Sequence, residues 1–225
     1  LGIKVLPPDV NISNGGFTAD NGKIRFGLNA VKNVGRNLIE RVVEERKEKP
    51  YSSLYDFCKR MHGTELNRRA VECLIKAGAF DSMGVNRHSL VEAVDGIIKS
   101  VESDSRRNLE GQLDLFSVMS GESQTADTDS YEIKPFPEYS HTELLQQEKE
   151  VSGLYLSGHP LDAYREQSAQ FATHTIKALT GEDANVPDNS HVRIVCTIVK
   201  SKMVTTKTNL SLIHISEPTR PRLIS

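Results

Sequence analysis

The sequence predicts a mainly α-helical fold, and three observations support this. Apolar residues recur at helical spacing in four segments between Gly35 and Arg106. A segment rich in Ser, Thr, Gly and Asp follows at Ser117–Ser130, with too few large apolar groups to offset the entropy lost on ordering. Helical sequence then resumes, and only His191–Val204 alternates apolar and polar residues as a strand does. We therefore expect a helical bundle, a flexible linker, a short helical segment and one late strand.

The bundle helices are predicted from one-sided apolar faces and from residues that start or stop helices. Ser53 and Asn86 are favoured helix caps, and Gly78 is a natural helix stop. Beyond the linker, further helices are expected at Glu143–Val151 and Leu161–Phe171. The four bundle helices are expected at Gly35–Lys49, Ser53–Met61, Asn67–Ala77 and Asn86–Arg106.

A short β-hairpin is predicted ahead of the bundle. Asn21-Gly22 is a strong turn signal, and it separates Phe17–Ala19 from Lys23–Phe26, which we expect to be strands. Earlier still, Leu1–Asn11 is short and apolar and looks like the end of a larger domain. Its two consecutive prolines are expected to stop regular structure, because proline fixes φ and lacks an N–H donor.

Composition limits the classes of protein to which the chain can belong. The net charge is −2, yet Lys and Arg are frequent from Lys23 to Arg107, so that region can meet a polyanion. Three scattered cysteines without a CxxC pair argue against disulfides, and although Cys58 and His62 have zinc-ligand spacing, a buried thiol is the commoner role. No apolar run approaches the ~18 residues that cross a bilayer. We expect a cytoplasmic protein with no metal site and no membrane contact.

Two glycine-containing connectors in the bundle have the features of a phosphate-binding turn. The first is Val31–Asn37 and the second surrounds Ala77–Phe80. Glycine allows close backbone approach, and the free amides of the following helix present the positive end of its dipole, which suits an anion. The second connector is the weaker match, because no basic residue follows its glycine and packing is an alternative role for it. The candidate phosphate contacts are Arg25, Lys32, Asn33, Val34, Gly35, Arg36, Lys76 and Gly78.

This arrangement resembles the tandem helix-hairpin-helix module of DNA-processing proteins. The resemblance implies that both connectors straddle the minor groove of double-stranded DNA and hold phosphates of both strands, so that binding is independent of base sequence. The alternative is a small helical bundle in which the glycines only end helices.

A pentapeptide beside the predicted linker is a candidate partner-binding motif. Exposed apolar side chains at the edge of a flexible segment limit solubility unless a partner's pocket receives them. The peptide resembles the motif by which bacterial polymerases and repair proteins bind the sliding clamp, with Leu115 and Phe116 in an apolar pocket. The alternative is a helix end whose Leu113 and Phe116 pack back on the bundle. The residues are Gln112, Leu113, Asp114, Leu115 and Phe116.

Several strings, in chain order, resemble the alpha subunits of bacterial DNA polymerase III, a family of replicative polymerases. They are Val5–Asn11, Arg25–Leu28 with Val31–Gly35, Leu74–Asp81 and Gly153–Leu161. The resemblance runs from Leu1 to about Asn209. It implies, in order, the end of a polymerase fingers domain at 1–23, a tandem helix-hairpin-helix DNA-binding domain at 24–108, a clamp-binding peptide and flexible linker at 109–139, a helical connector at 140–185, and the start of a truncated oligonucleotide-binding (OB-fold) barrel at 186–209.

The resemblance also implies an activity and partners. The family performs template-directed nucleotidyl transfer with two Mg²⁺ held by acidic palm residues, which the resemblance places before Leu1, so this fragment is expected to lack catalytic residues and to hold no cofactor. Asp127-Thr128-Asp129 mimics an acidic pair, but nothing in the predicted linker fixes metal geometry. Expected partners are double-stranded DNA, the sliding clamp and other replicase subunits. The alternatives are a non-enzymatic DNA repair or recombination adaptor built on helix-hairpin-helix motifs, and an independent nuclease, for which the sequence offers no site.

The last residues depart from the family. From Leu210 to Ser225 the chain resembles the conceptual translation of a transposase adaptor used to prepare sequencing libraries. We expect residues 210–225 to be an artefact of that origin. The barrel would then retain one strand with an unpaired edge.

Overall fold

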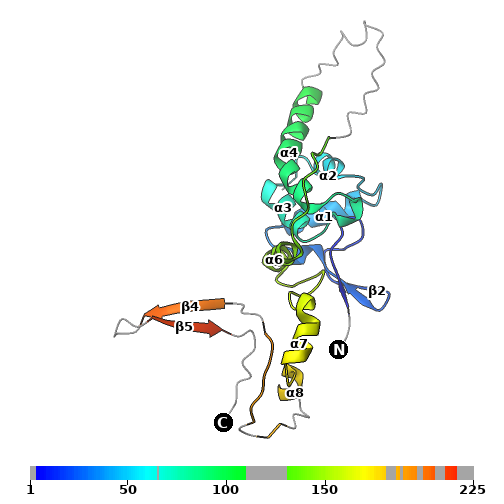
Figure 1. Cartoon of the computed structure of the whole chain (residues 1–225). Coiled ribbons are helices and arrows are strands. Elements are labelled where there is room, and N and C mark those ends of the chain that lie inside the picture. Colours follow the sequence, from blue (N-terminus) through cyan, green and yellow to red (C-terminus); the bar gives the residue numbers. More distant parts are fainter. Residues whose placement is uncertain are drawn as a thin grey trace. The chain divides into compact units, whose positions relative to one another are not determined.

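The computed structural model divides into two compact units, Leu1–Gly158 and His159–Ser225, and each is described by itself (Figure 1). The structure describes residues 4–64, 66–109, 131–180, 186–187, 190–196, 200–205 and 211–216. The pentapeptide 112–116 lies outside the described residues, as do Asp127 and Asp129.

The first unit begins with a small three-stranded sheet. Its strands are β1 (Val5–Leu6), β2 (Thr18–Asp20) and β3 (Lys23–Arg25), in the order β1-β3-β2. Strands β2 and β3 form the predicted hairpin, and both turn residues have the positive φ that a type I′ turn needs, 49° at position 21 and 76° at position 22. Strand β1 pairs in parallel with β3 and was not predicted, because two apolar residues are too few to show alternation.

Helices account for most of the remaining described residues of the first unit, and the four bundle helices occur where apolar spacing predicts them. The serine and asparagine caps form as expected: Ser53 Oγ accepts from the Asp56 N–H at 3.1 Å, and Asn86 Oδ1 from the Ser89 N–H at 2.8 Å. A capping box at Ser140 starts the next helix two residues earlier than expected. The elements are η1 (Leu28–Ala30), α1 (Arg36–Glu45), α2 (Leu54–Arg60), α3 (Arg68–Lys76), η2 (Asp81–Met83), α4 (Arg87–Leu109) and α6 (His141–Ser152).

The apolar faces of these helices meet in one core. Phe57 and Phe80 pack edge to face with ring centroids 5.1 Å apart, and Tyr51 packs on the other side of Phe57 at 5.0 Å. The predicted faces of α1, α3 and α4 are buried in this core. Its largest members are Phe26, Phe57, Phe80, Leu28, Leu38, Ile39, Leu54, Met61, Leu74, Ile75, Leu90 and Ile97.

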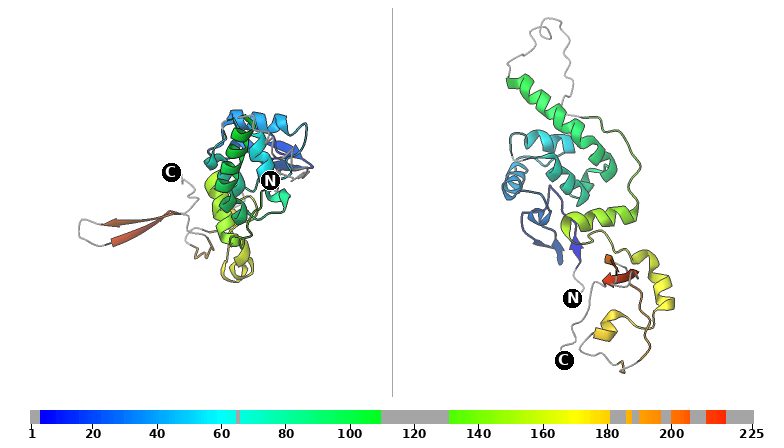
Figure 2. Two further views of the ribbon diagram at one scale, coloured as in Figure 1. Left: turned by 90° about the horizontal axis from the view of Figure 1, so that it is seen from above. Right: turned by 90° about the vertical axis from the view of Figure 1, so that its left-hand side faces the viewer.

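Residues 131–140, which we term the strap, run beside α4 to the start of α6 (Figure 2). The Phe136 N–H donates to Ser89 Oγ at 2.8 Å, and the Glu138 carboxylate accepts from the Arg87 N–H at 2.9 Å and the His88 N–H at 3.2 Å. The end of the segment expected to be a flexible linker is therefore packed on the first unit.

A glycine inside α4 makes room for the strap. Glycine in a helix interior lowers helix stability by about 1 kcal/mol relative to alanine, so a contact that requires glycine is expected at Gly96. A Cβ at Gly96 would lie 1.9 Å from Tyr131 Oη. Tyr131 in turn stacks on Tyr55, with ring centroids 6.4 Å apart. The absent side chain thus allows the first residue of the strap to lie on the helix.

The second unit contains η3 (Asp162–Tyr164), α7 (Arg165–Phe171), α8 (Ile176–Thr180), β4 (Lys200–Thr205) and β5 (Ser211–Ser216). The predicted strand His191–Val204 was confirmed at Lys200–Val204 and wrong at His191–Cys196, which has no regular structure. Strand β4 pairs antiparallel with β5, so one of its two edges is paired. Apolar alternation indicates an extended backbone, but only a neighbouring strand turns it into a ladder. Here Arg193 bonds Thr173 instead, with Arg193 O accepting from the Thr173 N–H at 2.9 Å.

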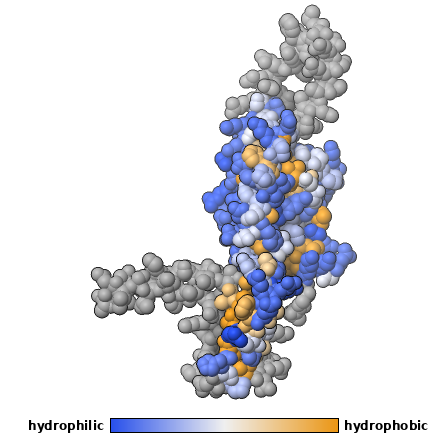
Figure 3. Space-filling view, viewed as in Figure 1, coloured by the Kyte–Doolittle hydropathy of each residue, from blue (hydrophilic) through white to orange (hydrophobic). Residues whose placement is uncertain are grey.

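Apolar surface gathers on the second unit over α7 and α8 (Figure 3). Phe171 is 64% exposed, and Ile176, Val192 and Ile194 are also exposed. The barrel expected from the family resemblance is not formed by the described residues of this unit, whose strands make one two-stranded sheet.

Candidate nucleic-acid interface

The first connector leads from η1 into α1 and leaves the start of that helix without a side-chain cap. Asn33 adopts a left-handed conformation with φ of 61°, and Gly35 is the N-cap residue, with no side chain to bond the first-turn amides. Val34 is half-buried, while Gly35 and Arg36 are exposed. The amides at the start of α1 carry the positive end of the helix dipole, so this turn is suited to an anion.

Two neighbouring helices hold the connector in place. The Lys32 N–H donates to Val151 O at 2.8 Å, and Lys32 Nζ donates to Glu150 O at 2.6 Å, so both bonds go to the last turn of α6. On the other side, Asn33 Nδ2 contacts Cys73 Sγ on α3 at 3.4 Å. Lys32 is therefore engaged with helix carbonyls, where a cation is favourable.

Free positive charge beside the connector comes from α1 and α3. Arg36 has no ion-pair partner among the described residues and is exposed. Arg69 is also exposed, and it lies one helical turn before Cys73 on α3, which places it on the face that meets Asn33. The sequence prediction missed Arg69, because the contact between Cys73 and the connector has no local signal.

Arg25 is committed elsewhere. Its guanidinium pairs with Asp20 at 2.7 Å and also donates to Pro7 O at 3.3 Å, and its side chain is 16% exposed. The charge predicted to meet a phosphate thus joins the hairpin to β1, and the structure does not bring it to the first connector as a free group.

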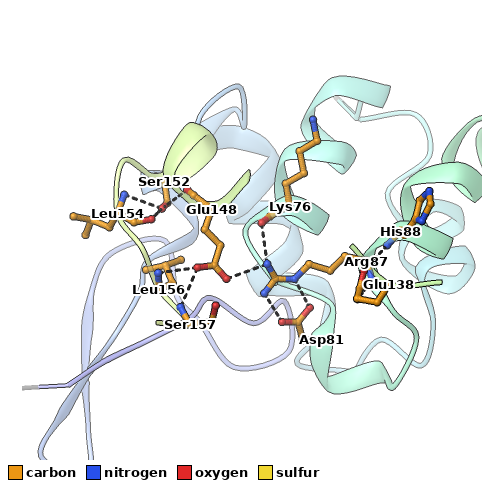
Figure 4. A network of polar contacts seen from close by, with 10 residues as sticks. All are labelled: Lys76, Asp81, Arg87, His88, Glu138, Glu148, Ser152, Leu154, Leu156 and Ser157. Atoms are coloured by element: carbon orange, nitrogen blue, oxygen red, sulfur yellow. Dashed lines mark hydrogen bonds and ion pairs between the residues drawn. The ribbon is translucent and has the colours of Figure 1, made fainter. Parts of the chain in front are cut away.

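The second connector is closed by side chains of this chain (Figure 4). Gly78 is buried, and its N–H donates to Ile75 O at 2.8 Å. The Arg87 guanidinium covers it and bonds Asp81 at 2.6 and 2.9 Å, Lys76 O at 3.3 Å and Glu148 at 3.0 Å. The Lys76 side chain points away from this network.

The Arg87 guanidinium remains charged in this buried position. Burial alone would lower the pKa of Arg87, but hydrogen bonds and charges from Asp81 and Glu148 more than offset it and raise that pKa. The side chain of Arg87 is only 7% exposed.

The start of α4 is occupied as well. Both oxygens of the Glu138 carboxylate accept from the Arg87 and His88 amides, as described for the strap. A carboxylate at this point satisfies first-turn donors and the helix dipole, as a phosphate would. The two connectors therefore differ: the amides of α1 have no side-chain cap, and those of α4 already hold an anion.

Comparisons with known proteins agree with the helix-hairpin-helix resemblance. A family model described as a helix-hairpin-helix motif matches residues 2–90. DNA polymerase III subunit alpha of Borreliella burgdorferi is 37% identical over 93% of this chain, which is 18% of that protein. The Bacillus subtilis protein of the same name is 33% identical over 97% of this chain and 19% of its own length, and that of Escherichia coli K12 is 35% identical over 76% and 15%.

The chain is homologous to a segment of the DNA polymerase III alpha subunit. It spans less than one fifth of the length of each of these relatives. The helix-hairpin-helix match ends within α4, so the strap and α6 lie beyond it although they contact both connectors.

The described residues show neither a metal centre nor a membrane span. Within those ranges no group of three or more His, Cys, Asp or Glu side chains is placed to hold an ion. None of the described helices is long and apolar enough to cross a membrane. Cys58, whose spacing from His62 resembles that of zinc ligands, is buried, and burial raises its pKa to about 12.

Replacing Gly78 by alanine should lower the free energy of unfolding more than replacing Gly84. Both glycines have positive φ, 85° and 76°, so each alanine costs about 1 kcal/mol in backbone strain. A Cβ at Gly84 meets no atom within 4 Å, whereas one at Gly78 would lie 2.4 Å from Arg87 Nη2 and 2.8 Å from Asp81 Oδ2. We expect losses of about 1 kcal/mol for Gly84→Ala and about 3 kcal/mol for Gly78→Ala in urea denaturation of the 225-residue chain. Equal losses would contradict a fixed guanidinium over Gly78.

Proposed function

We propose that this region binds the phosphate backbone of double-stranded DNA through the first connector, as one part of a DNA-directed DNA polymerase. The observation that carries the proposal is the N-terminus of α1, which has no side-chain cap and begins with the exposed Arg36. The exposed Arg69 shares the face of α3 that meets Asn33, and neither arginine has an ion-pair partner among the described residues. Homology to the polymerase subunits and the helix-hairpin-helix match support it.

The chemistry of this site favours backbone contact over base readout. Main-chain amides and a helix dipole bind an anion of any nucleotide equally, so recognition is independent of base sequence. Lys32, Asn33 and Gly35 shape the turn, and Arg36 supplies charge. Each phosphate that displaces counterions contributes a slope of about −0.9 to the dependence of log K on log salt concentration.

The proposal includes binding of the sliding clamp by residues 112–116. Their sequence, with two large apolar side chains and a polar glutamine, supports it. A clamp tether would raise the effective concentration of DNA at the first connector, so weak phosphate contacts would suffice for sustained binding.

The activity of the whole protein is proposed from its relatives. They are named as DNA polymerase III alpha subunits, which favours the polymerase over the non-enzymatic repair or recombination adaptor. Nucleotidyl transfer, its Mg²⁺ and contacts with other replicase subunits would belong to the complete polypeptide, since no described residues of this chain cluster as metal ligands.

Replacing Arg36 by glutamine should weaken binding to duplex DNA of any sequence. At 0.1 M salt we expect an affinity loss of about eightfold and a salt slope that is less steep by about 0.9, as for one lost phosphate contact. The measurement is fluorescence anisotropy with a labelled duplex over a range of salt concentrations.

Arg41→Gln is the matched control for Arg36→Gln. Arg41 lies on the same helix, but its guanidinium is paired with Glu45 at 3.7 Å. The control should bind DNA nearly as the unchanged chain does. Equal slopes for all three proteins would contradict a phosphate at the start of α1.

Leu115→Ala combined with Phe116→Ala should abolish clamp binding and leave DNA binding unchanged. The reason is that two apolar anchors would be removed while the first connector stays intact. The measurement is calorimetric titration of the 225-residue chain into the bacterial sliding clamp, and equal binding by both chains would contradict the proposed tether.

A further inference from the structure

We infer that Glu148 is a positioning residue for the first connector: it fixes the last turn of α6, which in turn holds the turn that meets phosphate. The inference rests on the proposed DNA binding and deepens it. Glu148 lies outside the segment that matches the helix-hairpin-helix model, and it does not itself reach the connector.

Both oxygens of this carboxylate are bonded inside the protein. Glu148 is 0% exposed, and its Oε1 pairs with Arg87 Nη1 at 3.0 Å. Its Oε2 accepts from the Leu156 N–H at 2.8 Å and the Ser157 N–H at 2.9 Å (Figure 4). A buried carboxylate is costly unless paired and hydrogen-bonded, so these bonds hold its position firmly.

The last turn of α6 also holds the first connector, through hydrogen bonds from Lys32. Glu150 O and Val151 O, two and three residues beyond Glu148, accept both bonds from Lys32. Gly153 ends α6 with φ of 79°, and its N–H donates to Lys149 O. Glu148 therefore joins Arg87, which covers the second connector, to the helical turn whose carbonyls bond the first connector.

The position of this turn decides where the amides of α1 point. Lys32 is followed directly by Asn33, whose left-handed conformation starts the bend into α1. If the last turn of α6 shifts, Lys32 moves with it, and the connector loses both of its hydrogen bonds to that helix. Phosphate binding through several amides needs all of them aimed at one point, so a small shift loses the contact.

Arg87 offers a matched pair of substitutions that tests this role. Glu148→Gln and Asp81→Asn each remove one carboxylate charge from the same guanidinium, but only Glu148 also anchors α6. Both variants should unfold at lower urea concentration than the unchanged chain. Only Glu148→Gln should weaken binding to a labelled duplex, by about eightfold at 0.1 M salt, with a slope less steep by about 0.9.

A second variant covers the case in which Glu148→Gln does not fold. Glu148→Asp keeps the charge but is one methylene shorter, so it cannot reach Arg87 and the Leu156 and Ser157 amides together. It should show the same change of slope with a smaller loss of stability.

The outcomes separate the inference from the proposed function. If the unchanged chain binds duplex DNA with a salt slope and the folded Glu148 variants keep both affinity and slope, the positioning role is wrong and the proposed function stands. If Asp81→Asn and Glu148→Gln reduce the salt slope equally, the positioning role is wrong, and the loss of DNA binding comes from a general loss of stability. If the unchanged chain shows no salt-dependent binding, the proposed function fails and the inference fails with it.

Discussion

Two carboxylates meet one buried guanidinium in the first unit, and this network joins segments that are distant in sequence. Arg87 bonds Asp81 after the second connector and Glu148 on α6, and it lies over Gly78, where a Cβ would collide with its guanidinium. Because Arg87 and Glu148 are both buried, removing either charge leaves the other group poorly compensated. Segments distant in sequence are thereby held in one arrangement: the α3–α4 turn, α6, and through Lys32 the entry to α1.

This arrangement gives the two connectors different roles. At the second connector, Arg87 covers Gly78, and the Glu138 carboxylate of the strap accepts hydrogen bonds from the first amides of α4. At the first connector, the start of α1 has no side-chain cap, and Arg36 and Arg69 have no ion-pair partner among the described residues. In the proposed function, the first connector binds DNA while the second organises the fold. The strap and α6 contact the helices of the bundle directly, through Glu138 and Glu148.

Local signals in the sequence predicted the helices well, because apolar spacing and caps such as Ser53 and Asn86 act within one turn. The predicted strand was wrong at His191–Cys196, because a ladder depends on a partner strand that periodicity does not reveal. The candidate site was predicted only in part for the same reason. Basic residues and glycines have two common uses, and which one applies to Arg25 or Gly78 depends on Asp20 and Arg87 side chains that meet them in space. Glu148 had no signal, since a glutamate in a polar stretch of helix resembles a surface residue.

Hydrogen exchange of the backbone amides, with and without duplex DNA, tests the central claim that phosphate binds at one hairpin only. We expect DNA to slow exchange in peptides covering residues 33–39. Exchange in peptides covering residues 85–90 should stay unchanged, because the Arg87 and His88 amides already bond Glu138. Protection of both segments would show that DNA displaces the strap. Protection of residues 85–90 alone would contradict the assignment of phosphate binding to the first connector.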